Sequence, residues 1–111
     1  MKNFKIIFQT YTYDANGDEK PANHWIRIIV AQSLDWAKKI AKAMRDEEVD
    51  RELYLSDPVL VEETGEDPDI NSLDSAETWS WVIGNLGLDD DDVELVPHPA
   101  DPNETVGIRV K

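Results

Sequence analysis

The stretch FKIIFQTYTYDANGDEKPANHWIRIIVA, residues 4–31, decides the fold. Its two ends, 4–13 and 24–31, are rich in aromatic and β-branched residues and alternate in pattern, which is typical of β-strands. Between them, Asn16 and Gly17 form a strong turn signal because both residues tolerate positive φ angles. The stretch therefore predicts a β-hairpin with a long polar tip.

The alternation also predicts which side chains of the hairpin face the core, because successive residues of a strand point to opposite faces. The second face would be aromatic and should be covered by the rest of the chain, by a second subunit or by a partner. We expect the core face to contain Phe4, Ile6, Phe8, Ile26, Ile28 and Val30. We expect the other face to contain Lys5, Ile7, Tyr11, Tyr13, Trp25, Arg27 and Ile29.

Two helices are expected after the hairpin. Residues 33–48 place apolar side chains at helical spacing, and Ser33 can cap the first turn by accepting a hydrogen bond from a free amide. Residues 72–87 repeat the pattern and should end at Gly87 in a left-handed conformation. The expected buried faces contain Leu34, Ala37, Ile40, Ala41, Met44, Ala76, Trp79, Val82, Ile83 and Leu86.

Three more extended segments complete the pattern. Residues 52–64 are interrupted by Pro58, which indicates an edge strand or two short pieces because proline cannot donate to a sheet ladder. Residues 92–99 and 105–111 are the expected last strands. The order β-β-α-β-α-β-β predicts a single domain, 1–111, of the α+β class. It should be a two-layer sandwich whose mostly antiparallel, four- to five-stranded sheet carries both helices on one face.

Charge is distributed unevenly along this chain of net charge −13. Residues 1–45 hold eight lysines and arginines against four acidic residues, whereas residues 46–111 hold three against twenty. Such a division predicts a basic and an acidic region, unless folding interleaves the two.

Four consecutive aspartates, residues 89–92, lie directly before an expected strand. They could bind a metal ion, imitate a nucleic-acid backbone or keep a turn in water. A calcium loop alternates its ligands, with glycine at the sixth position and glutamate at the twelfth. The run has neither feature, and the loop that begins at Asp14 has Glu19 and Trp25 at those positions. We therefore expect no metal site and interpret the run first as a solvated turn.

No catalytic motif is recognisable, so we expect neither an enzyme nor a cofactor. The absence of cysteine excludes thiolate nucleophiles, thiolate metal sites and disulfides. The two histidines, His24 and His98, belong to no catalytic motif, and we expect His98 at the surface between its two prolines. An unrecognised carboxylate site remains an alternative. No apolar run is long enough to cross a bilayer and no signal-peptide pattern is present, so we expect a cytoplasmic protein.

The acidic charge favours binding to a protein with a basic surface, because opposite charges accelerate association. Direct binding to nucleic acid or to a membrane is not expected, since phosphate would be repelled. In size, acid content and lack of cysteine the chain resembles DNA-mimic proteins, which implies an inhibitor of a nucleic-acid-processing or defence complex encoded by a phage or mobile element. The expected contacts are Asp46, Glu47, Glu48, Glu62, Glu63, Glu66, Asp67, Trp81, Asp89, Asp90, Asp91 and Asp92.

A second hypothesis is a small assembly protein that forms a homodimer through its aromatic sheet face. Tyr11, Tyr13 and Trp25 are the expected contacts. Trp81 points away from the buried stripe of its helix, so it either lies under the acidic loop or is exposed. An exposed tryptophan would be a candidate anchor in an interface.

Overall fold

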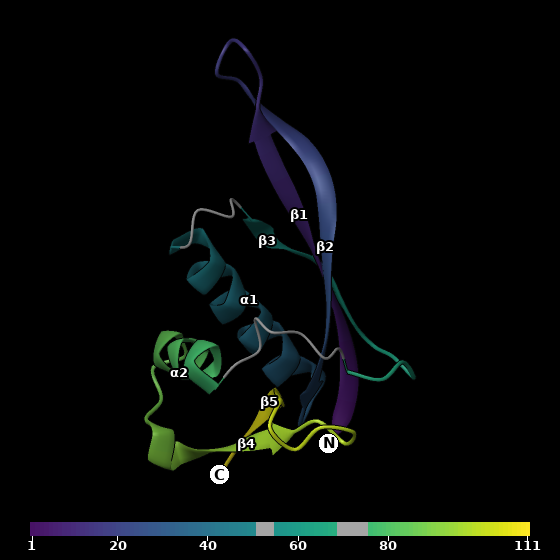
Figure 1. Cartoon of the computed structure of the whole chain (residues 1–111), viewed down its shortest axis with the longest axis vertical. Helices are drawn as coiled ribbons and strands as arrows, with labels where there is room; N and C mark the ends of the chain where they lie inside the picture. The colour runs from purple at the N-terminus through teal and green to yellow at the C-terminus, as the bar shows by residue number, and fades with distance from the viewer. Residues whose placement is uncertain (51–54, 69–75) are drawn as a thin grey trace.

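The computed structural model describes residues 1–50, 55–68 and 76–111, without the side chains of 47–50, 55–57 and 76–78. The chain forms a sheet covered on one face by two helices (Figure 1). The strands and helices follow one another in the predicted order. They are β1 (Lys2–Tyr13), β2 (Glu19–Ala31), α1 (Leu34–Asp50), β3 (Leu55–Glu63), α2 (Ala76–Asn85), the short 3₁₀ helix η1 (Asp90–Asp92), β4 (Val93–Pro97) and β5 (Thr105–Val110).

The sheet has five strands in the order β3-β1-β2-β5-β4. Every neighbouring pair is antiparallel except β2 and β5, which are parallel. The predicted α+β class and mostly antiparallel sheet are therefore confirmed. Pro58 lies on the edge strand β3, as its inability to donate a ladder hydrogen bond led us to expect.

The predicted faces of β2 were wrong. Residues directly opposite each other in an antiparallel pair point to the same face, and Phe4 lies opposite Ile29. The alternation within each strand is as expected. However, alternation in the sequence does not show which side chains of β2 lie on the same face as the core side chains of β1. That match is set by the register in which the two strands pair. Trp25, Arg27 and Ile29 therefore share the helix face with Phe4, Ile6 and Phe8, and Ile26, Ile28 and Val30 lie on the opposite face.

The start of α1 and the end of α2 lie at the expected residues. The Ser33 hydroxyl accepts a hydrogen bond from the Trp36 amide at 3.2 Å, which caps the first turn of α1. At the end of α2, Gly87 has a φ of 75°, and the amides of Gly87 and Leu88 donate back to the carbonyls of Gly84 and Ile83. These two hydrogen bonds are the Schellman arrangement that a left-handed glycine permits.

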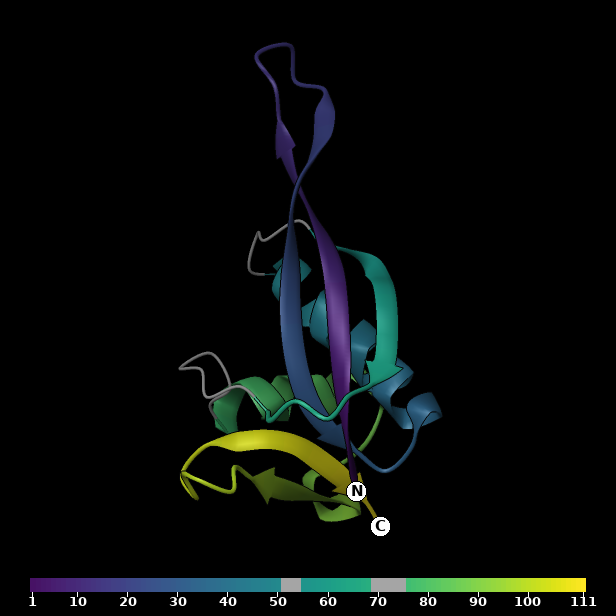
Figure 2. The same ribbon diagram turned by 90° about the vertical axis from the view of Figure 1, so that its right-hand side faces the viewer.

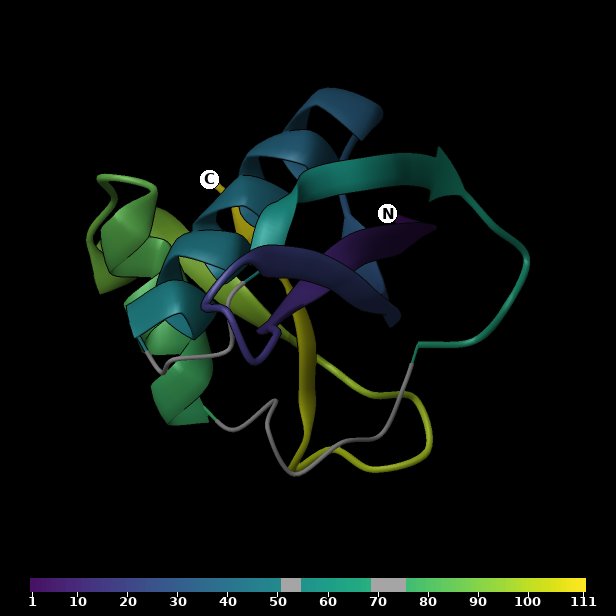
Figure 3. The same cartoon turned by 90° about the horizontal axis from the view of Figure 1, so that it is seen from above.

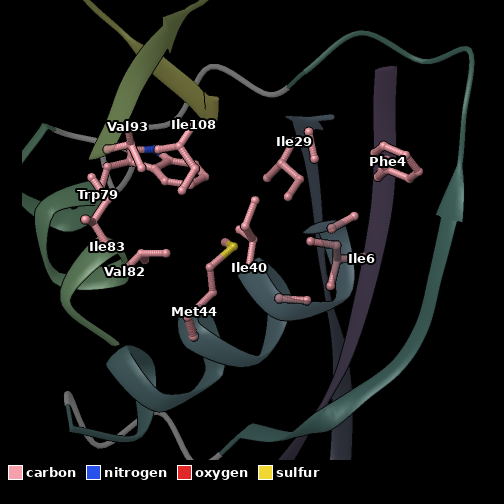
Figure 4. Close-up of a cluster of buried hydrophobic side chains, with 14 of the residues drawn as sticks. Phe4, Ile6, Ile29, Ile40, Met44, Trp79, Val82, Ile83, Val93 and Ile108 are labelled. Atoms are coloured by element: carbon pink, nitrogen blue, oxygen red, sulfur yellow. The ribbon is translucent and has the colours of Figure 1, made fainter. Parts of the chain in front are cut away.

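The core lies between the helices and the sheet (Figure 4). Among the described side chains, both α-helices and the strands β1, β2, β4 and β5 contribute buried residues to this core, and Val61 of β3 packs at its margin. Leu34, expected to be buried, is instead 41% exposed, because the first turn of α1 lies at the rim of the sheet beside the end of β3. The labelled core residues are Phe4, Ile6, Ile29, Ile40, Met44, Trp79, Val82, Ile83, Val93 and Ile108.

The junction between β2 and β5 is narrow. Only Val30 and Gly107 face each other across this parallel pair. The Gln32 side-chain amide extends the junction by accepting from the Val110 amide at 2.8 Å and donating to the Val110 carbonyl at 3.0 Å. From the helix layer, the Trp79 indole donates to the Thr105 carbonyl at 3.0 Å. The β4–β5 hairpin is therefore attached through a few specific polar contacts as well as through the core.

The β1–β2 hairpin projects beyond the rest of the sheet (Figures 1 and 2). Thr10 is the last residue of β1 that pairs with β3, and beyond it the two strands pair with no other strand of the described part of the chain. At the tip, the Asp14 carboxylate accepts hydrogen bonds from the Asp18 and Asn16 amides at 2.9 Å each. The bond from Asp18 is the largest of the influences that lower the pKa of Asp14.

Candidate protein-binding surface

A segment that we call the strap, residues 64–68, crosses the sheet face opposite the helices (Figure 2). Its Thr64 amide donates to the Asn3 carbonyl at 3.0 Å, and the Asn3 side chain donates to the Glu66 carbonyl at 3.0 Å. On the same face Ile28 and Val30 are only 8% exposed. The chain therefore covers part of the sheet face opposite the helices itself. This is the first of the three possibilities given by the sequence, which were the rest of the chain, a second subunit or a partner.

His98 is buried, so the expectation of a surface histidine was wrong. Its Nδ1 accepts a hydrogen bond from the Ala100 amide at 2.9 Å, and its Nε2 donates to the Pro68 carbonyl at 2.9 Å. These partners require the neutral ring with the proton on Nε2, because an amide only donates and a carbonyl only accepts. The flanking prolines suggested an exposed turn, but the ring is buried because it pairs two backbone groups that are 32 residues apart.

The His98–Pro68 hydrogen bond brings two acidic segments together. Figure 3 shows the strap and the β4–β5 connection on the same side of the molecule. Their carboxylates, together with one from the end of β3 on the same sheet face, are exposed or half-exposed. We call this set the strap surface: Glu62, Glu66, Asp67, Asp101 and Glu104.

One lysine partly neutralises the strap surface. The Lys5 ammonium lies 3.1 Å from the Glu66 carboxylate. Hydrogen bonding and attraction from Lys5, and then a hydrogen bond from the Thr64 hydroxyl, lower the pKa of Glu66 below its ordinary value. An exposed pair of this kind adds little stability, so its main effect is to fix the position of the Glu66 carboxylate.

Sequence reasoning found Glu62, Glu66 and Asp67 but missed Asp101 and Glu104. The latter two are isolated acids in a proline-containing turn, and no charge run marked them. Glu63, which was expected beside Glu62, points to the opposite face, where it pairs with Lys2 at 3.6 Å. Adjacent residues of a strand are separated by the sheet itself, so a run of acids in a strand does not make one patch.

The aspartate run forms the turn that was the preferred interpretation. Asp92 is the end of η1, where its carboxylate accepts a hydrogen bond from the Asp89 amide at 3.0 Å and its carbonyl accepts one from the Lys111 amide at 2.9 Å. The carboxylates of residues 89–91 are exposed. Figures 1 and 3 place this turn on the opposite side of the molecule from the strap.

The remaining expected contacts are also dispersed. Asp46 pairs with Arg45 at 3.0 Å and lies in a groove between the helices that also contains Lys39 and Lys42, so its surroundings are of mixed charge. The side chains of Glu47 and Glu48 lie outside the described residues. Trp81 is 59% exposed on the outer side of α2, the second of the two positions that the sequence allowed.

The three expected self-association residues do not share one face. Trp25 lies on the helix face, where it is half-buried, its ring centroid 5.3 Å from that of Phe8, with the Arg27 guanidinium 5.4 Å from the Trp25 ring. Tyr11 is half-buried and Tyr13 is 51% exposed, both on the projecting part of the hairpin. An aromatic interface, if formed, would therefore involve the hairpin tip rather than a continuous sheet face.

Within residues 1–50, 55–68 and 76–111, no three histidine or acidic side chains are grouped closely enough to hold a metal ion. In the same part of the chain, none of the helices has the length and apolar character needed to cross a membrane. No protein-family model, curated protein or solved structure matches the chain.

Proposed function

We propose that this protein is a non-enzymatic binding module whose strap surface engages a basic surface of another protein. The observation that carries the proposal is the His98–Pro68 hydrogen bond, which holds two acidic segments that are distant in the sequence next to each other. Because the strap is also bonded to β1, the carboxylates are positioned before binding, and less conformational entropy is lost when a partner docks.

The partner class follows from the charge. The strap surface presents five carboxylates, one of which, that of Glu66, forms an ion pair with the Lys5 ammonium, on a chain of net charge −13. Large basic surfaces inside cells mostly belong to proteins that hold nucleic acid, so the sharper proposal is a cytoplasmic, DNA-mimic-like inhibitor of a nucleic-acid-processing or defence complex, of phage or mobile-element origin. Binding would be fast and sensitive to salt.

An assembly protein is the second candidate, and the projecting hairpin favours it. The tip pairs with no third strand among those described, and its Tyr13 is 51% exposed. A two-stranded ribbon is only marginally stable alone, and docking into another subunit would stabilise it.

Two triple variants, each of which loses three negative charges, distinguish binding through the strap surface from binding through net charge alone. The first, Glu62→Gln/Asp67→Asn/Glu104→Gln, neutralises three strap carboxylates that make no side-chain hydrogen bond among the described residues. The second neutralises Asp89, Asp90 and Asp91 on the other side of the molecule. Each protein is used as bait in bacterial lysate at near-physiological and at high salt, and captured proteins are identified by mass spectrometry.

We expect the parent chain and the aspartate-run variant to capture the same nucleic-acid-binding protein at low salt only, and the strap variant to lose it. Equal loss from both variants would assign binding to net charge. No salt-dependent capture by the parent chain would remove the acidic-surface proposal and leave the hairpin tip as the candidate.

A further inference from the structure

The outer edge of β3 is apolar and open to solvent. β3 is the first strand of the sheet order, so only β1 pairs with it among the described strands. On it, Val59 is 57% and Leu60 is 38% exposed. An exposed, apolar strand edge is a template for pairing with another strand, and proteins usually protect such edges with charge, proline or a covering segment. Pro58 interrupts one end of the strand, which leaves residues 59–63 as the stretch that is free to pair.

Two lysines of α1 lie beside this edge. Lys38 and Lys42 are four residues apart, hence on the same side of the helix, and both are exposed. Together with residues 58–61 they line a hollow of about 360 Å³. Neither lysine makes an ion pair with another described residue. An occupant that fits is an extended segment with apolar side chains followed by carboxylates.

We propose that the occupant is a second copy of this chain, whose β3 pairs antiparallel with the first β3 to give one continuous sheet. The free stretch of β3 has the required sequence, with Val59, Leu60 and Val61 followed by two glutamates. It is also exposed for pairing in every copy. An antiparallel pair of identical strands has a two-fold axis, so each contact would form twice.

The direction of α1 relative to β3 makes the charges match. The start of α1, at Leu34, lies beside Glu63, whereas Lys42 lies further along, beside Pro58 and Val59. Reversing a second strand about Val61 places its Glu63 opposite Val59 of the first copy, and therefore beside Lys42. Glu63 and α1 are on the same side of the sheet, as this contact requires. Within one chain, the Glu63 carboxylate lies 3.6 Å from the Lys2 ammonium, and both side chains are more than half exposed. This ion pair is therefore weak, and Glu63 can exchange it for a contact with Lys42 of another copy.

The interface is small, so the expected dimer is weak. A few paired residues per strand bury less than a standard interface of about 1,600 Å², and such contacts commonly have dissociation constants of about 1 μM to 1 mM. Analytical ultracentrifugation over that range of protein concentration measures the equilibrium for the intact chain.

Reversing the charge of either residue tests whether Lys42 of one copy contacts Glu63 of the other. Lys42→Glu alone and Glu63→Lys alone each place like charges together at both ends of the interface, and each should raise the dissociation constant about tenfold. An equimolar mixture of the two variants restores opposite charges at both contacts, so the mixture should dimerise like the parent chain. An effect of net charge alone would instead move the two variants in opposite directions.

Val59→Glu on β3 should also weaken the dimer about tenfold, because it removes apolar contact and places a second carboxylate opposite Glu63 of the other copy. Leu95→Glu is the matched control, since Leu95 is 45% exposed on the other edge strand, β4, and should leave the dimer unchanged. Circular dichroism checks that each variant is folded. A parent chain that stays monomeric up to about 1 mM, a mixture that stays monomeric, or equal effects of Val59→Glu and Leu95→Glu would each overturn the proposal.

Discussion

Replacing Gly107 with alanine tests a close approach between the backbones of β2 and β5. A Cβ atom at this position would overlap the carbonyl oxygen of Val30 and would lie 2.9 Å from its carbonyl carbon. Both atoms belong to the backbone of β2, so the overlap cannot be relieved by rotating a side chain. Because Val30 and Gly107 are the facing residues of the β2–β5 junction, relief requires the two strands to separate at that point.

Two opposing effects set the change in the free energy of unfolding that Gly107→Ala should cause. Overpacking that forces the backbone to shift destabilises a protein by about 1–3 kcal/mol, and a clash with backbone at the centre of a short junction belongs near 3 kcal/mol. Replacing glycine with alanine also restricts the unfolded chain, which stabilises by about 0.4–1 kcal/mol. The net expectation for Gly107→Ala is a loss of about 2 kcal/mol in the free energy of unfolding, out of a total of about 5–15 kcal/mol.

Gly84→Ala is the control with the opposite expected sign. Gly84 lies in α2, and a Cβ atom there meets nothing within 4 Å. Alanine is favoured over glycine inside a helix by about 1 kcal/mol, so this variant should be more stable than the parent chain. Urea unfolding followed by tryptophan fluorescence measures both, because Trp79 is buried against the β5 backbone. A Gly107→Ala variant within about 0.5 kcal/mol of the parent, or a Gly84→Ala variant that is equally destabilised, would refute the reasoning.

Three other substitutions test the polar contacts. His98→Ala leaves the buried Pro68 carbonyl and the part-buried Ala100 amide without their partner. It should lower the free energy of unfolding by about 2 kcal/mol and speed up hydrogen exchange of the Ala100 amide; unchanged exchange would contradict the bond. Gln32→Ala removes two hydrogen bonds across the β2–β5 junction and should destabilise by about 1–2 kcal/mol in urea unfolding, whereas an unchanged midpoint would show that the core alone holds β5. Because Lys5 lowers the folded-state pKa of Glu66, the stability that Glu66 adds is present above its ordinary pKa of 4.5 and is lost as the pH falls through the lowered value. Urea midpoints of Glu66→Gln and the parent chain should therefore differ near neutral pH and converge in acid; a constant difference would assign the effect to packing.

Local features of the fold could be predicted because their causes lie within a few residues. The Ser33 cap and the left-handed Gly87 depend on the chemistry of one side chain and its own helix end. Pro58 marks an edge strand for an equally local reason, the missing amide hydrogen. The face assignment of β2 failed because it depends on the register across the hairpin, which the long turn fixes.

The candidate site could be predicted only in part, because runs of charge in a sequence are not surfaces. In β3, Glu62 and Glu63 are neighbours in the chain and lie on opposite faces of the sheet. The aspartates of residues 89–92 are used locally, to build a turn. The strap surface instead depends on His98, whose burial follows from a contact with the Pro68 carbonyl that no local pattern indicates.

The two proposed surfaces are compatible with each other because they lie on different sides of the sheet. The strap surface is on the face opposite the helices, whereas the charged part of the β3 contact, Lys42 and Glu63, is on the helix side. Pairing through β3 about a two-fold axis perpendicular to the sheet would leave both strap surfaces accessible and place them on the same face of one continuous sheet. A basic partner long enough to span both, as nucleic-acid-binding clefts are, would then bind two surfaces at once. Its second contact would be intramolecular, and avidity could raise the overall affinity by about 10²–10⁴ without any new contact. A weak dimer would thus be sufficient, because a partner that bridges both strap surfaces would itself stabilise the β3 pairing.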